Sequence, residues 1–132
     1  MLSNFLKIFS LFFLLVCQSF SHSNHEKLME AKQPYPKINK FVVKKKTASE
    51  FEAKIQIENF VISEDDKAGD NVGHFILIIN NKNVMYYSDN FIIEDKYFKK
   101  GKNEIILVLM SNDHSMLTKN GDLIYKSFLL VK

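Results

Sequence analysis

A series of short apolar runs, each ended by turn-forming residues, constrains this chain more than any other feature of its sequence. In residues 51–58 the odd positions are apolar and the even positions are polar, which is the pattern of a strand with one buried face. Residues 38–43, 91–93 and 123–131 are further strand candidates. No segment after residue 37 shows a sustained helical period, so the chain is predicted to be all-β from about residue 38 onward.

Two of the runs are apolar on both faces, which indicates strands in the middle of a sandwich. They are residues 73–79 and 104–110. The first is followed by a tight turn at Asn80-Asn81 into residues 84–87, so a hairpin is expected there. With about seven short strands at a spacing of roughly 8–12 residues, we expect an antiparallel immunoglobulin-like β-sandwich over residues 38–132. It lacks the disulfide and the tryptophan of that fold.

The N-terminus has the pattern of a signal peptide. Lys7 precedes residues 8–17, an apolar run shorter than the about 20 residues that a membrane-spanning helix needs. Small residues stand at the two positions that a signal peptidase reads, so cleavage is predicted after Ser21. We expect a signal peptide (1–21), a flexible polar leader (22–37) and one folded domain, and therefore a periplasmic or secreted protein.

Two alternatives to simple cleavage stay open. In the first alternative, the N-terminal run is retained as an anchor helix. In the second, Cys17 is lipidated as in bacterial lipoproteins, although Val16 stands where that motif has a small residue. Cys17 is the only cysteine. Cleavage after Ser21 leaves a protein without disulfides, thiolate catalysis or cysteine-ligated metals.

Composition narrows the range of partners. All 18 basic side chains are lysines, and the net charge is only +3. Without arginine the chain has no bidentate donors for guanine or phosphate, so we expect no nucleic-acid partner. We also expect no membrane span after cleavage. The expected partner is an unknown protein or small ligand of the cell envelope. A protein partner can add a strand to an exposed edge of the sandwich.

A compact polar group, Asn112-Asp113-His114, lies between the last two apolar runs. His74 opens one central strand, and His114 follows another, so the two imidazoles would converge if these strands are neighbours. Imidazole is a ligand for copper and zinc, and we therefore consider a weak divalent Cu or Zn site at His74 and His114, with Asp113, Asn112 or a tyrosine as a further ligand. The alternative is structural: both histidines and Asp113 hydrogen-bond locally and hold the loop.

Other candidate sites are weaker. His22 and His25 lie near the new N-terminus, where two histidines can bind copper or nickel. The alternative is that both belong to an exposed tail. Ser111 or Ser115 with His114 and Asp113 has the residue types of a catalytic triad. Adjacent residues on one short loop rarely point at one another as a triad requires, so we expect no enzyme.

The same motifs carry a family resemblance over residues 50–131. Gly73-His74 with the following apolar run, Asn112-Asp113-His114 and Asn120-Gly121 occur in the order of a Gly-His-x-His-Leu … Asn-Asp-His … Asn-Gly pattern. The chain thereby resembles a family of small exported bacterial β-sandwich proteins of uncharacterised function. Ile76 stands where that pattern has its second histidine, so the histidine-rich metal site that the resemblance implies reduces here to His74 and His114. We expect a non-enzymatic binding or accessory module of the cell envelope.

Overall fold

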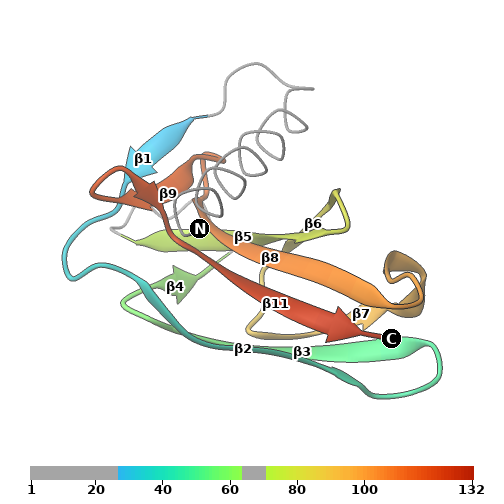
Figure 1. The fold of residues 1–132 in the computed structure, drawn as a ribbon. Coiled ribbons are helices and arrows are strands. Elements are labelled where there is room, and N and C mark those ends of the chain that lie inside the picture. The colour runs from blue at the N-terminus through green and yellow to red at the C-terminus, as the bar shows by residue number, and fades with distance from the viewer. Residues whose placement is uncertain (1–26, 64–70) are drawn as a thin grey trace.

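The computed structural model describes residues 27–63 and 71–132. The predicted signal peptide, its cleavage site, Cys17, and the histidines at positions 22 and 25 lie outside the described residues. The described chain is all-β and forms two sheets that pack face to face (Figure 1). Its one helical element is a short 3-10 turn at Asp95–Tyr97.

The smaller sheet has three antiparallel strands, and the larger has eight. The smaller sheet runs in the order β2 (Lys37–Lys45), β3 (Glu50–Glu58) and β7 (Asn90–Glu94). The larger sheet has the path β1-β9-β8-β5-β4, with β6 paired to β5, β11 paired to β8 and β10 paired to β9. Its strands are β1 (Leu28–Glu30), β4 (Val61–Ile62), β5 (Val72–Ile79), β6 (Lys82–Tyr86), β8 (Lys102–Ser111), β9 (Met116–Lys119), β10 (Asp122–Leu123) and β11 (Tyr125–Val131).

The period-2 pattern of β3 produces one wall of the core. Phe51, Ala53 and Ile55 are buried, whereas Lys54 and Gln56 are exposed. Across the core, Phe41 of β2 meets Phe128 of β11 edge-on, with ring centroids 6.0 Å apart. The alternation read from residues 51–58 is therefore confirmed.

Strands β5 and β8 are buried on both faces, as their continuous apolar runs predict. On the inner face, Phe75, Leu77 and Ile79 of β5 join the core between the sheets, together with alternate residues of β8. On the outer face, a second apolar cluster contains Ile76, Ile78, Ile106, Val108, Met110 and Met116. The large sheet is thus apolar on both sides along its two central strands.

Asparagines in the left-handed region make the tight turns. Asn80 and Asn81 have φ values of 47° and 68°, which fits the primed turn of a two-residue hairpin between β5 and β6. Asn120 and Gly121, at 52° and 85°, connect β9 to β10 in the same way. Both turns were expected from the sequence, because asparagine and glycine tolerate positive φ better than other residues.

The structure differs from the sequence expectation in the described part of the leader. Leu28–Glu30 forms β1, which pairs in parallel with β9. The Glu30 carboxylate accepts hydrogen bonds from the Thr118 hydroxyl at 2.7 Å and from the Gly121 amide at 3.3 Å. A three-residue strand has too little periodicity to be recognised in a sequence, and its long-range partners determine its conformation.

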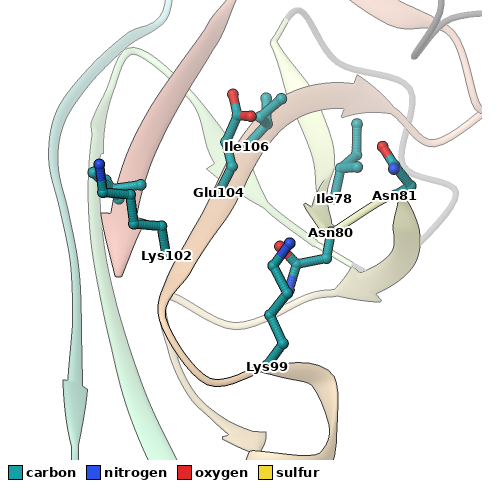
Figure 2. A pocket seen from close by; sticks show the side chains of 8 residues that line it. Ile78, Asn80, Asn81, Lys99, Lys102, Glu104 and Ile106 are labelled. Carbon is teal, nitrogen blue, oxygen red and sulfur yellow. The ribbon is translucent and has the colours of Figure 1, made fainter. Parts of the chain in front are cut away.

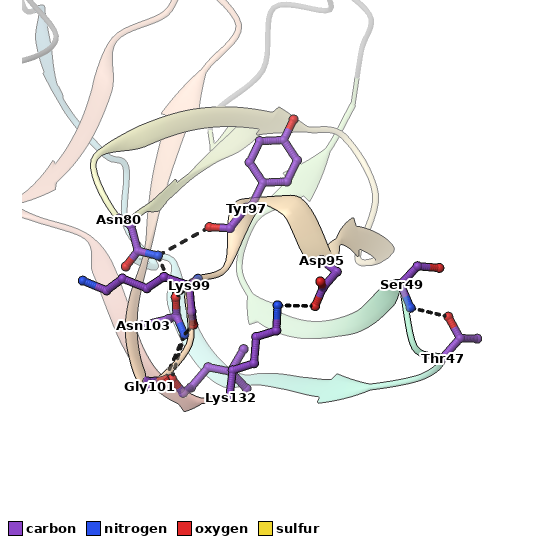
Figure 3. A network of polar contacts seen from close by, with 10 residues as sticks. Thr47, Ser49, Asn80, Asp95, Tyr97, Lys99, Gly101, Asn103 and Lys132 are labelled. Atoms are coloured by element: carbon purple, nitrogen blue, oxygen red, sulfur yellow. Dashed lines mark hydrogen bonds and ion pairs between the residues drawn. The ribbon is translucent and has the colours of Figure 1, made fainter.

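A buried asparagine at the start of β8 stabilises the end of the large sheet that lies away from β1 and β9. The Asn103 side chain is fully buried, and its amide donates to the carbonyl oxygens of Lys99 and Gly101 at 2.8 and 3.1 Å. Its oxygen accepts from the Lys99 backbone and from the Asn80 side chain, at 2.8 and 2.7 Å (Figure 3). Nearby, Lys132 forms an ion pair with Asp95 at 2.7 Å. The turn that leads into β8 is therefore closed by side chains.

Candidate metal-binding site

The loop between β8 and β9 is closed by its own polar groups. The Ser111 amide donates to the Ser115 carbonyl at 2.9 Å, and the His114 amide donates to the Ser111 carbonyl at 3.0 Å. The Ser115 amide donates to the Ser111 hydroxyl at 3.2 Å. The Asp113 carboxylate accepts from the Ser111 hydroxyl and from the Ser115 amide, the latter at 3.1 Å. His114 has a φ of 66°. This left-handed residue sits at the tip of the loop, where its side chain is exposed.

His74 reaches the same place from β5. Its side chain is only 1% exposed. Gly73 precedes it and pairs with Ser111, where a Cβ atom would lie 1.9 Å from the carbonyl oxygen of Met110. Glycine is therefore required for the close approach of β5 to β8 next to the loop.

The two histidines converge, as the sequence hypothesis required. Their ring centroids are 5.3 Å apart and their planes are inclined by 71°. The Nδ1 atom of His74 lies 3.4 Å from Oδ1 of Asn112, and the ring centroid of Tyr87 lies 4.9 Å from that of His74. The Nε2 atom of His74 is buried and has no hydrogen-bond partner among residues 27–63 and 71–132.

The surroundings of His74 keep its imidazole neutral near pH 7. Burial is the main cause that lowers the pKa of His74 below its ordinary 6.5, the Asn112 hydrogen bond opposes this shift, and the nearby His114 adds to it. Because Asn112 Oδ1 is an acceptor, the proton of the neutral ring resides on Nδ1. The lone pair is then on Nε2, which is the atom available to a metal ion.

The ring separation is compatible with one shared ion. A metal about 2.0–2.1 Å from an imidazole nitrogen lies about 3.1 Å from that ring's centroid. Two such rings at a tetrahedral angle would have centroids about 5 Å apart, close to the 5.3 Å found for His74 and His114.

Asp113 is close in sequence but is already engaged. Hydrogen bonds from Ser111 and Ser115 lower the pKa of its carboxyl, so it stays ionised and holds the loop. In a catalytic triad the serine hydroxyl would contact His114. The Ser111 hydroxyl instead donates to Asp113 within the loop. Among residues 27–63 and 71–132, no three His, Cys, Asp or Glu side chains are grouped as a metal site requires.

A tyrosine was considered from the sequence as a further ligand, without a choice among the tyrosines, and the structure brings Tyr87 next to His74. The signal for this contact was present in the sequence, because the turn at Asn80-Asn81 sets the hairpin register. That register pairs Phe75 with Tyr86, and Tyr87 consequently follows beside His74.

Two of the grooves that adjoin the large sheet differ in their distance from His74. One of about 460 Å³ is at the end of β5 away from His74, where its walls include Ile78, Lys99 and Glu104 (Figure 2). The other, of about 440 Å³, adjoins the histidine site through Tyr87 and is also lined by Ile57 and Phe60. Within the part of the chain that the structure describes, no helix has the length and apolarity of a membrane span.

Comparisons with protein-family models, with curated proteins and with solved structures found no match to this chain. The family resemblance read from the sequence motifs accordingly stays a prediction.

Proposed function

We propose that this protein is an exported, non-enzymatic binding module of the cell envelope, and that its ligand is a copper or zinc ion held by His74 and His114. One observation carries the proposal. The Nε2 atom of His74 is buried without a hydrogen-bond partner, on a ring whose centroid is 5.3 Å from that of His114. A buried polar atom without a partner is unfavourable, and a bound ion would compensate for it.

The hydrogen bond to Asn112 supports this proposal further. Metal-bound histidines usually donate their second ring N–H to a carbonyl or carboxylate oxygen, which fixes the tautomer and the ring orientation. The Nδ1 atom of His74 has such an acceptor in the Asn112 side chain. The exposed ring of His114 is the entry side, since His74 is buried behind it.

Strand order supports an immunoglobulin-like assignment of the sandwich. The sheet β2-β3-β7 faces a sheet that contains the consecutive neighbours β11-β8-β5-β6. These correspond to the A-B-E and G-F-C-C′ orders of immunoglobulin-like folds. The apolar residues 8–17, followed by small residues at 19 and 21, support export by a cleaved signal peptide.

The test is a calorimetric titration of the exported, processed protein with Cu(II) and with Zn(II). We expect one ion per chain, and we expect His74→Ala and His114→Ala each to abolish binding or weaken it at least ten-fold. The double variant His22→Ala/His25→Ala is the matched control, and it should bind as the unmodified protein does. Binding that survives His114→Ala but disappears in this control would place the ion in the leader and overturn the proposal.

A further inference from the structure

We infer that the bound ion is monovalent copper and that Met110 supplies a thioether ligand beside the two histidines. This inference rests on the proposed function, because it names the metal and a third ligand of the same site. It derives from the pairing of β5 with β8 and not from the loop that contains His114.

The register places Met110 beside His74. In the antiparallel ladder between β5 and β8, His74 is directly opposite Met110. Directly opposed residues project to the same face of a sheet, with Cβ atoms about 4.5–5.5 Å apart. Met110 therefore extends from the same face as His74, and the loop with His114 begins immediately after β8.

The side chain of methionine suits this role. It is unbranched and flexible, so its sulfur can adjust to a neighbouring site without movement of the backbone. Met110 is 5% exposed and belongs to the outer apolar cluster, where its neighbours include Val108 and Met116. A soft sulfur atom in apolar surroundings is a ligand that favours Cu(I).

The charge of the site favours the same ion. Two imidazole ligands and a thioether carry no negative charge, and the nearby Asp113 carboxylate is held by Ser111 and Ser115. A divalent ion in such surroundings would keep its full charge in a poorly solvated position, which is more unfavourable than for a monovalent ion. Carboxylate ligands, which harder ions prefer, are absent from this set of three.

Met116 provides a matched control. It pairs with Met110 from the other side, on β9, and so it lies one strand further from His74. It has nearly the same burial and belongs to the same cluster. Replacement of either methionine by leucine conserves volume and apolar character, so both variants should fold.

The experiment measures Cu(I) affinity anaerobically, by competition with bicinchoninate in the presence of ascorbate, and Zn(II) affinity by calorimetry. Met110→Leu should weaken Cu(I) binding at least ten-fold and leave Zn(II) binding within two-fold, whereas Met116→Leu should change neither. X-ray absorption of the Cu(I)-loaded protein should show a sulfur neighbour that disappears in Met110→Leu.

The outcomes separate this inference from the proposed function. Histidine-dependent binding with no sulfur neighbour and no effect of Met110→Leu would overturn the inference and leave the histidine site in place. Equal losses in Met110→Leu and Met116→Leu would assign the effect to packing and also overturn it. Failure of His74→Ala and His114→Ala to affect any ion would overturn the proposed function itself.

Discussion

Two of the buried polar side chains in the large sheet, Asn103 and His74, have nearly equal burial but differ in their hydrogen bonding. Asn103, at the start of β8, is 0% exposed, and its oxygen and nitrogen are both hydrogen-bonded (Figure 3). His74, at the other end of the sheet on β5, is 1% exposed, and its Nε2 atom has no partner. Complete hydrogen bonding is typical of a structural polar residue, whereas the atom of His74 that has no partner is the observation on which the proposed ion site rests.

The largest effect is expected at the glycine that positions the histidine. Gly73→Ala would place a Cβ atom 1.9 Å from the Met110 carbonyl oxygen, so β5 and β8 must separate there. We expect a loss of about 3 kcal/mol in the free energy of unfolding, because backbone cannot move aside as a side-chain end can. Urea denaturation measures this loss. Gly121→Ala is the control for adding a methyl group to a glycine. The added methyl group meets open space at that position, and the only strain comes from the positive φ of residue 121.

The Asn103 network should be the next most sensitive. Asn103→Ala removes the side-chain partner of the Lys99 amide and carbonyl, and it removes one of the two partners of the Asn80 side-chain amide, which keeps its bond to the Tyr97 carbonyl. We expect a loss of about 2–3 kcal/mol in the same assay, since each unsatisfied buried group carries its own desolvation penalty. A loss below about 1 kcal/mol would contradict the description of Asn103 as a structural residue.

His74 should respond in the opposite way. His74→Leu removes a buried nitrogen that has no partner, and it gives up only one long hydrogen bond, to Asn112 at 3.4 Å. In metal-free buffer with a chelator, we expect the free energy of unfolding to stay within about 1 kcal/mol of the unmodified protein. A loss as large as that of Asn103→Ala would remove the distinction between the two ends of the sheet.

The smallest effect concerns Glu30, which joins β1 to the turn after β9. Hydrogen bonds from Thr118 and from the amides of Asn120 and Gly121 lower the pKa of this carboxyl below its ordinary 4.5. Since the folded-state pKa is the lower one, the stabilisation is complete above pH 4.5 and is lost as the pH falls through the folded-state value. Melting temperatures of the unmodified protein and Glu30→Gln should therefore differ at pH 7, and the difference should shrink as the pH falls below 4.5 and through the folded-state pKa. A difference that does not shrink on acidification would contradict the assignment.

Much of the fold was predictable because its signals are local. The alternation in residues 51–58, the two doubly apolar runs and the asparagine turns each specify a conformation within a few residues. The strand Leu28–Glu30 was not predictable, since its three residues are held by β9 from more than eighty positions away. His74 and His114 were identified as candidates by residue type, but nothing in the sequence measured the distance between them.

By itself the sequence determined most of the strands, the positions of the turns and the candidate residues for a metal site. Only the tertiary structure decided that β5 and β8 are neighbours in a register that opposes His74 to Met110, and that the ring of His114 lies next to that of His74. The physical reason is that side-chain periodicity reports the burial of each strand, whereas pairing between distant strands depends on the packing of the whole sandwich. That pairing brings the backbones of β5 and β8 close together at Gly73. It also leaves the Nε2 atom of His74 without a hydrogen-bond partner among the described residues.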